Sequence, residues 1–192
     1  MSVADPSLPR CGWALGSDVE TVYHDTVWGV PQRDPIRLFE YLNLEGAQAG
    51  LSWRTILQKQ AAYQRAFAGF DPPAVSRFDG DDVERLMLDA GIVRHRAKIT
   101  ATIGNARAWL ELEDPVAFLW SFVDGRPVQP AIASLADIPA RTAASDRMST
   151  ELRHRGFRFV GPTICYAFMQ ACGMVNDHEL SCFRCGEVRS LG

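Results

Sequence analysis

Apolar residues recur along this chain at helical spacing. Ile36, Phe39 and Leu42 lie three residues apart, which places them on one stripe of a helix, and residues 95–112 carry a similar pattern. No segment alternates convincingly between apolar and polar residues with a period of two, and the chain has no internal repeat. These patterns predict an all-α fold.

Start and stop signals predict where the helices begin and end. Asp34 and Pro35 are suited to open one helix, which we expect to break around residues 46–50, and Ser52 can cap the next. The expected helices span residues 18–28, 34 to the break at 46–50, 52–69, 81–91, 95–112, 115–122, 145–155 and 162–172, with one helical turn at 134–138.

Two later segments refine this prediction. The run Asp71-Pro72-Pro73 should stop the preceding helix, and Asp81 with Glu84 matches a capping-box pattern. Residues 124–139 carry Asp-Gly and several prolines, which predicts the longest irregular region of the chain.

The chain length suits one domain. Its 192 residues can bury a sizeable core, and we expect a flexible tail at residues 1–9 followed by a single helical domain at 10–192. No apolar run approaches the ~20 residues of a membrane span, and the first residues lack the apolar core of a signal peptide. We therefore expect a cytoplasmic monomer that does not enter a membrane.

The charge balance leaves only local patches for an acidic partner. The formal net charge is -3, so any surface for nucleic acid must be local. Residues 94–98 and 153–158 form two basic patches, although such runs are more often simply solvated. Of the 20 Lys and Arg residues only Lys59 and Lys98 are lysines, so candidates for a Schiff base are few.

One carboxylate lies in an unusual place. Glu45 lies among the small and apolar residues of the stretch LEGAQAGLSW, residues 44–53, after a helix with an apolar stripe. Charged side chains are rarely buried without a partner, so Glu45 is either solvated at a helix end or held for chemistry. Burial rules alone leave both interpretations open.

A short hairpin is expected between two helices near the C-terminus. The segment holds Phe157, Arg158, Phe159, Val160 and Gly161, and a proline follows it at the first position of the next helix. Backbone N–H groups of such a hairpin can bind a phosphate regardless of base sequence. The flanking arginines favour this interpretation over an ordinary helix connection.

The cysteines and histidines allow a metal site. Five cysteines, an odd number, argue against a disulfide framework. Cys11, His24, His178 and Cys182 are ligand types of a tetrahedral zinc site, and the last two could share one side of a helical turn. Cys182 and Cys185 form a competing CxxC pair, so spacing alone leaves the ligand set undecided.

Several motifs, in order, resemble those of bacterial 3-methyladenine DNA glycosylase I. The likeness extends from about Arg10 to Cys182, nearly the whole chain. It is carried by RCGW at 10–13, YHD at 23–25, WGVP at 28–31, LEGAQAGLSW at 44–53, DAGIVRHRAKI at 89–99, IGNARA at 103–108 and FVGPTICYAFMQACGMVNDH at 159–178.

The resemblance implies a fold, an activity and a cofactor. The family has a helix-hairpin-helix fold, removes 3-methyladenine from alkylated double-stranded DNA, and carries a structural zinc held by two cysteines and two histidines. Residue by residue, the zinc ligands match Cys11, His24, His178 and Cys182. Cys185 then becomes a bystander.

The resemblance also assigns a base-binding pocket. Tyr23, Glu45 and Trp53 match the family's pocket residues, with Glu45 in the catalytic role, and Trp13 and Trp28 match nearby aromatic positions. A carboxylate could accept a hydrogen bond from the exocyclic amine of the cationic base, and an indole could stack on its ring.

Further matches and mismatches concern the DNA-binding side. Gly50 and Leu51 resemble the wedge that fills the gap left by a flipped base, beside the DNA-binding hairpin. Ala47 stands where the family has Gln, and Glu20 stands where an aromatic is often found, so the pocket shape could differ.

The resemblance favours a site without the catalytic aspartate of many helix-hairpin-helix glycosylases. Asn176 most nearly matches that position, and Asp177 could instead orient the imidazole of His178. We expect a monofunctional glycosylase that uses water as the acceptor and has no lyase step. The alternatives are a catalytically silent reader of damaged DNA and a zinc hydrolase, although four protein ligands would leave a hydrolase no open metal position.

Overall fold

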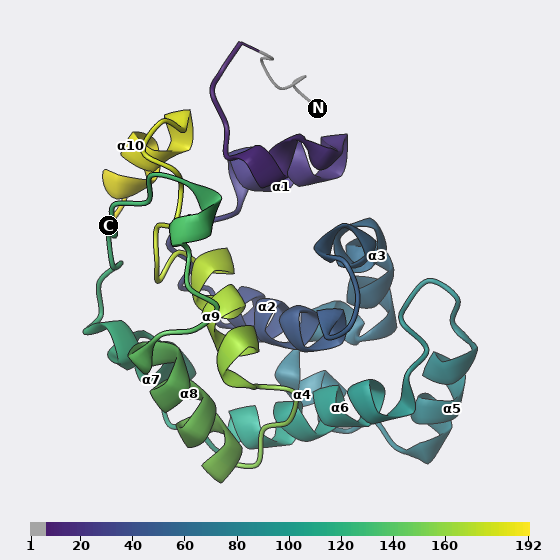
Figure 1. The fold of residues 1–192 in the computed structure, drawn as a ribbon. Coiled ribbons are helices and arrows are strands. Elements are labelled where there is room, and N and C mark those ends of the chain that lie inside the picture. The colour runs from purple at the N-terminus through teal and green to yellow at the C-terminus, as the bar shows by residue number, and fades with distance from the viewer. Residues whose placement is uncertain (1–6) are drawn as a thin grey trace.

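The computed structural model describes residues 7–192 (Figure 1), in which every regular element is helical. The only strand-like pairs within this range are two isolated bridges, Val128 with Val175 and Ile132 with Glu179. The elements are η1 (Gly12–Gly16), α1 (Asp18–Thr26), α2 (Pro35–Gln48), α3 (Trp53–Ala66), η2 (Ala68–Phe70), α4 (Pro72–Val75), α5 (Gly80–Leu88), α6 (Arg96–Leu110), α7 (Pro115–Trp120), η3 (Ser121–Val123), η4 (Leu135–Asp137), α8 (Ala143–His154), α9 (Pro162–Ala171) and α10 (Phe183–Arg189). The all-α prediction is confirmed.

Helix α2 lies at the centre of the molecule, beside α9 (Figure 1). Every residue from Leu38 to Ala47 is buried, and α3, α6 and α9 all pack against the helix. A helix buried on all sides must satisfy any polar side chain that it carries from neighbouring elements. Within the described chain, no helix is both long and apolar enough for a membrane crossing.

The predicted starts of α2 and α3 are confirmed. The Asp34 carboxylate accepts hydrogen bonds from the N–H groups of Ile36 and Arg37, and Pro35 occupies the first turn. The Ser52 hydroxyl accepts from the N–H of Thr55 at the start of α3. These local caps satisfy backbone donors that a helix start leaves unpaired.

The expected break around residues 46–50 is confirmed, because α2 ends at Gln48. A Cβ atom added at Gly46 would lie 3.0 Å from the backbone oxygen of Phe159 and 3.1 Å from its Cβ. Glycine here lets the hairpin approach α2 closely. The chain then turns at Gly50, whose φ of +81° favours glycine.

One local prediction shifts in the middle of the chain. The preceding helical elements end before the run at 71–73, as expected, and Asp71 also caps the short helix α4. The capping box of α5 joins Asp79 and Asp82, not Asp81 and Glu84. Several acidic residues compete for these positions, and only the register of the folded chain selects the pair.

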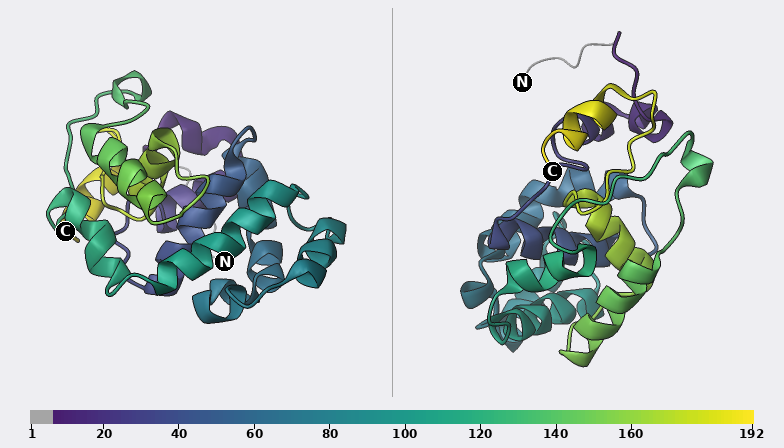
Figure 2. Two further views of the ribbon diagram at one scale, coloured as in Figure 1. Left: turned by 90° about the horizontal axis from the view of Figure 1, so that it is seen from below. Right: turned by 90° about the vertical axis from the view of Figure 1, so that its left-hand side faces the viewer.

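The first and last segments lie side by side at one end of the molecule (Figures 1 and 2). The backbone N–H of Phe183, in the unpredicted helix α10, donates to the carbonyl of Pro9 at 2.9 Å. The flexible tail expected at residues 1–9 therefore has an anchored end at Pro9, and residues 1–6 lie outside the described part of the chain.

The irregular segment 124–142 is attached to the C-terminal segment at Val128 and Ile132. The Val128 N–H donates to the Met174 carbonyl, the Asn176 N–H donates to the Val128 carbonyl, and the Leu180 N–H donates to the Ile132 carbonyl, at 2.8–2.9 Å. These bonds hold the predicted turn, η4, beside the terminal segments (Figure 2, right).

Gly173 should be a position where even alanine destabilises the fold. Its φ is +70°, and an added Cβ would lie 2.4 Å from backbone atoms of Val30 and Pro31. We expect Gly173→Ala to lower the free energy of unfolding by at least about 2 kcal/mol, measured by urea denaturation. The control Gly104→Ala lies inside α6 with nothing near its Cβ and should stabilise by about 0.5–1 kcal/mol. Equal effects of the two substitutions would contradict this account.

Candidate metal centre and base pocket

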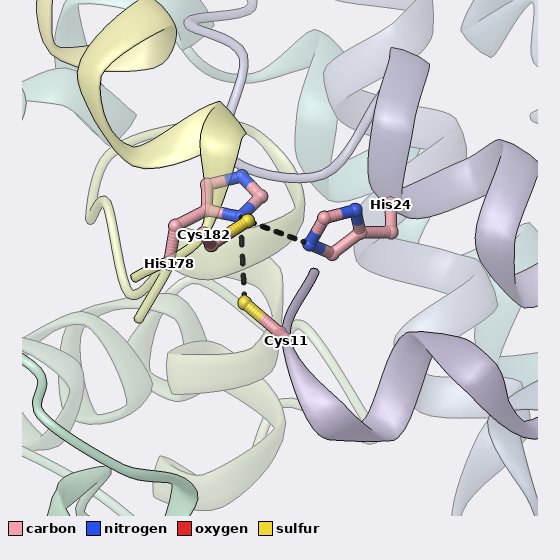
Figure 3. Close-up of side chains that lie close together, drawn as sticks. All are labelled: Cys11, His24, His178 and Cys182. Carbon is pink, nitrogen blue, oxygen red and sulfur yellow. Dashed lines mark hydrogen bonds between the residues drawn. The ribbon is translucent and has the colours of Figure 1, made fainter. Parts of the chain in front are cut away.

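Four buried side chains from the two ends of the chain converge on one point (Figure 3). Cys11 and His24 come from the N-terminal segment, and His178 and Cys182 come from the C-terminal segment. One ligand atom of each lies within 4.8 Å of all the others. The Cys182 sulfur lies 3.4 Å from Nε2 of His24 and 3.7 Å from Nδ1 of His178.

The second nitrogen of each imidazole is held by an oxygen. Nδ1 of His24 lies 2.8 Å from the Asp25 carboxylate, which is also paired with Arg10. Nε2 of His178 lies 3.1 Å from the carbonyl of Trp28. An acceptor beside one ring nitrogen keeps the proton on that nitrogen. The other nitrogen then directs its lone pair toward the cluster.

The donor set fits a metal ion. Two thiol sulfurs and two imidazole nitrogens, all buried, are the ligand types of tetrahedral metal sites with no open position. Hydrogen bonds from Cys11 and then from the two imidazoles lower the pKa of Cys182, which favours the thiolate that binds a metal.

One sequence-based detail of this cluster is corrected, and the expected exclusion of Cys185 is confirmed. His178 and Cys182 do not share a helical turn, because residues 178–182 form an irregular turn in which the Cys182 N–H donates to the Glu179 carbonyl. Cys185 is buried outside the cluster, so the competing CxxC pair contributes only Cys182. The path of the backbone after His178 determines which cysteine reaches the cluster, and residue spacing alone does not show this path.

A pocket of about 270 Å³ lies next to the cluster and is walled by aromatic rings. Its volume is close to the ~300–1,000 Å³ of small-molecule sites. The lining residues are Trp13, Tyr23, Trp28, Glu45, Gln48, Trp53, Leu135, Ile138, Ala167 and Gln170. All five residues that we expected around a base, Tyr23, Glu45, Trp53, Trp13 and Trp28, therefore line one pocket.

The aromatic walls brace one another. The Trp13 ring meets the Trp28 ring edge-on with centroids 5.0 Å apart, and it also meets the His24 ring edge-on at 5.5 Å. On the other side, the centroids of Tyr23 and Trp53 are 5.5 Å apart. These contacts hold the rings in place before any ligand binds.

Among residues 7–192, Glu45 is the only carboxylate that lines this pocket, and it is 4% exposed. Its side chain has no hydrogen-bond partner among residues 7–192, and burial raises its pKa to about 8. Glu40, on the same helix, is equally buried but accepts hydrogen bonds from Arg37, Gln60 and Gln64. The unpartnered carboxylate of Glu45 is thus available to a ligand.

Tyr23 links the pocket to the metal-binding cluster. It precedes His24 on α1, and its hydroxyl has no hydrogen-bond partner in the described chain. Burial, followed by the charge of Glu45, raises the pKa of Tyr23 well above its usual value. The hydroxyl therefore remains protonated and able to donate a hydrogen bond in the pocket.

The hairpin expected at residues 157–161 joins α8 to α9 and is anchored by polar contacts. Asn105 accepts from the Arg158 N–H at 2.8 Å and donates to the Arg158 carbonyl at 3.1 Å. Phe159 adopts a left-handed φ of +55°, and the Ser149 hydroxyl donates to the Val160 carbonyl. Gly161 then precedes the first turn of α9.

The loop between α2 and α3 extends beyond the pocket. Glu45 lies on α2 and Trp53 begins α3, so the connection with Gly50 and Leu51 lies between two pocket residues. Leu51 is 41% exposed. An exposed leucine on a short turn held between two helices is suited to enter a space in a partner.

A family comparison agrees with this geometry. A model of the methyladenine glycosylase family matches residues 13–185. The chain belongs to the methyladenine glycosylase family. It is 52% identical over 179 residues to DNA-3-methyladenine glycosylase 1 of Escherichia coli (strain K12), which covers 91% of this chain and 96% of that relative. It is 42% identical over 177 residues to DNA-3-methyladenine glycosylase of Haemophilus influenzae, covering 90% and 96%.

Solved structures of the methyladenine glycosylase family have the same fold. A crystal structure of 3-methyladenine DNA glycosylase I matches with a TM-score of 0.89 at 51% identity, covering 91% of this chain and 98% of that one. A second, a variant in complex with 3-methyladenine, matches with a TM-score of 0.88 at 35% identity, covering 91% and 96%. The family resemblance expected from the sequence is confirmed.

The basic patches of this methyladenine glycosylase divide between structural and surface roles. Lys98 donates to the carbonyls of Ala47 and Ala49 and so caps the C-terminal end of α2. Arg96 and Arg158 instead flank a surface groove of about 820 Å³ between α6 and the hairpin. The two patches thus meet beside the hairpin.

The sequence missed several pocket residues and misjudged one neighbour. Leu135 and Ile138 reach the pocket from the irregular segment, and Gln170 reaches it from α9. Asp177 does not orient His178, because its carboxylate accepts from Tyr166 and Gln170 instead. Only the three-residue spacing of Ala167 and Gln170 on one helix could have indicated a shared face.

Asp25 should control metal affinity through His24. We expect Asp25→Asn to weaken metal binding by about 10–100-fold, because it loses the charged acceptor that orients the imidazole. Competition with a colorimetric chelator measures this, and Asp18→Asn on the exposed start of the same helix is the control. Unchanged affinity in Asp25→Asn would show that the backbone alone orients His24.

The raised pKa of Glu45 predicts a pH-dependent stability. Its folded pKa of about 8 exceeds the unfolded value, so the wild type should lose stability as pH rises from about 5 toward 8. Glu45→Gln should remove this loss, which we expect to be on the order of 1–3 kcal/mol in urea denaturation at several pH values. Glu84→Gln is the control, since Arg96 lowers the pKa of that exposed carboxylate. Parallel pH profiles for wild type and Glu45→Gln would contradict the assignment.

Proposed function

We propose that this methyladenine glycosylase hydrolyses the N-glycosidic bond of 3-methyladenine in alkylated double-stranded DNA, without a lyase step. The observation that carries the proposal is Glu45, a buried carboxylate with no protein partner inside an aromatic pocket. A flat cationic base supplies both features that such a pocket lacks, a positive charge and a ring to stack.

The target nucleotide must leave the duplex to reach this pocket. Extrusion costs a few kcal/mol of unstacking. Leu51, on the turn after Gly50, is suited to fill the space that the base leaves in the stack. Phe159, Val160 and Gly161 would bind the adjacent phosphate through backbone N–H groups, with Arg158 adding charge.

The leaving base needs little chemical help. Methylation at N3 already gives the adenine formal positive charge, so the glycosidic bond is activated and the base needs no protonation. Near neutral pH burial keeps Glu45 largely protonated, and a cationic base in the pocket would favour its carboxylate. That carboxylate would accept a hydrogen bond from the exocyclic amine. Trp53 would stack on the ring with a cation–π energy of ~0.5–2 kcal/mol, and the Tyr23 hydroxyl would donate a hydrogen bond.

Water is the acceptor in this proposal because no lysine lines the pocket. Lys59 donates to the carbonyls of Ala90 and Gly91, and Lys98 caps α2. Asn176, at the position most nearly matching the aspartate of other glycosylases, is buried and donates to Gln129 and to the Cys185 carbonyl. The residues around the pocket thus favour hydrolysis of an easily released base.

We propose zinc as the metal held by Cys11, His24, His178 and Cys182, since its preferred ligands match this set. When bound, a metal here would stabilise the fold by joining the two ends of the chain. The pocket, the hairpin and the wedge loop all belong to one chain, so we expect a monomer to be sufficient.

Base release from methylated DNA tests the proposed function. We expect the wild type to release free 3-methyladenine, Glu45→Gln to release it about a hundredfold more slowly, and both to bind abasic DNA with similar affinity. Base-release chromatography and fluorescence anisotropy measure these quantities. Binding without any release by the wild type would favour a silent reader of damaged DNA. A borohydride-trapped protein–DNA adduct would contradict a lyase-free mechanism, and equal loss of both properties would make Glu45 structural.

A further inference from the structure

A second polar group lines the base pocket in a fixed orientation. Gln170 lies on α9, and its side-chain Nε2 donates to the Asp177 carboxylate at 2.7 Å. The same carboxylate oxygen accepts the hydroxyl proton of Tyr166 at 2.6 Å. Asp177 and Tyr166 are 1% and 4% exposed, so this network lies behind the pocket wall.

The network decides which end of the Gln170 amide is free. The Asp177 oxygen accepts this hydrogen bond, so the NH₂ end of the Gln170 amide faces Asp177. The amide oxygen of Gln170 then points elsewhere, and it has no hydrogen-bond partner among residues 7–192. An inverted amide would place its oxygen against the Asp177 oxygen, so that two acceptors would face each other. The other carboxylate oxygen of Asp177 is buried and has no partner among the described residues.

The backbone of Gln170 is fixed as well. Its carbonyl accepts the N–H of Gly29 at 3.1 Å, next to the pocket residue Trp28, and the N–H of Gly173 at 3.2 Å. The α9 wall of the pocket is thereby joined to the segment that carries Trp28. Gln170 therefore presents its amide oxygen from a rigid support, which is the condition for selectivity between similar bases.

We infer that Gln170 is a specificity-determining residue that selects a 6-amino purine over a 6-oxo purine, an inference that rests on the proposed function. The amino group of adenine carries two N–H donors, which can meet the amide oxygen of Gln170 and the carboxylate of Glu45. A guanine places an acceptor oxygen at the same position. The amide oxygen of Gln170 carries no proton, so two acceptors would then face each other, which a desolvated site rejects. Asp177 and Tyr166 act as positioning residues.

The test compares the release of two methylated bases from one DNA substrate. We expect Gln170→Met, which keeps the side-chain length but has no amide, to lower the ratio of 3-methyladenine to 3-methylguanine release roughly tenfold. Gln64→Met is the matched control, because Gln64 also donates to a buried carboxylate, Glu40, but lies outside the pocket. Its ratio should equal that of the wild type.

The outcomes separate this inference from the proposed function. A wild type that releases no 3-methyladenine would overturn the proposed function itself. An unchanged ratio in Gln170→Met, or an equal loss of both bases, would overturn the role of Gln170 and leave the proposed function standing. Metal content and thermal melting check the folding of each variant. Should Gln170→Met not fold, Gln170→Asn, whose amide is too short to reach both Asp177 and the base, should lower the ratio too.

Discussion

The burial of residues 38–47 of α2 is the constraint on which the rest of the structure depends. Three polar side chains lie on this helix within the core, and they differ in their hydrogen-bond partners. Glu40 is satisfied by α3 and a neighbouring arginine. Asn43 accepts from Asn105, which in turn holds the backbone of the hairpin. Glu45 alone has no partner in the described chain, and the pocket opens at that position. One helix thus positions both the hairpin and the base pocket.

The joining of the two chain ends shapes the other side of the pocket. A metal-ligand candidate and a pocket residue are neighbours on α1, since His24 directly follows Tyr23. The Trp28 carbonyl faces the imidazole of His178 while its ring lines the pocket. Holding the terminal segments together therefore also holds the aromatic walls. The cluster can support the chemistry without touching the base.

Local signals in the sequence were reliable where one residue acts on its own neighbours. Asp34 and Ser52 cap the helices that they were expected to cap, because a cap needs only a nearby backbone N–H. The contact of Gly46 with the hairpin could not be predicted, because it joins two segments more than a hundred residues apart in the chain. The pocket role of Gln170 was missed for the same reason, since nothing near it in the chain marks that helix face.

By itself, the sequence determined the all-α class, most helix positions and, through family motifs, the residues of the metal cluster and pocket. Helical periodicity and capping are short-range properties, so they can be read along the chain. Only the tertiary structure decided that Glu45 lacks a partner while Glu40 has three, and that Asp177 holds Gln170. These outcomes depend on which side chains of distant segments meet in a desolvated interior, where one hydrogen-bond partner determines whether a polar group is structural or free for a ligand.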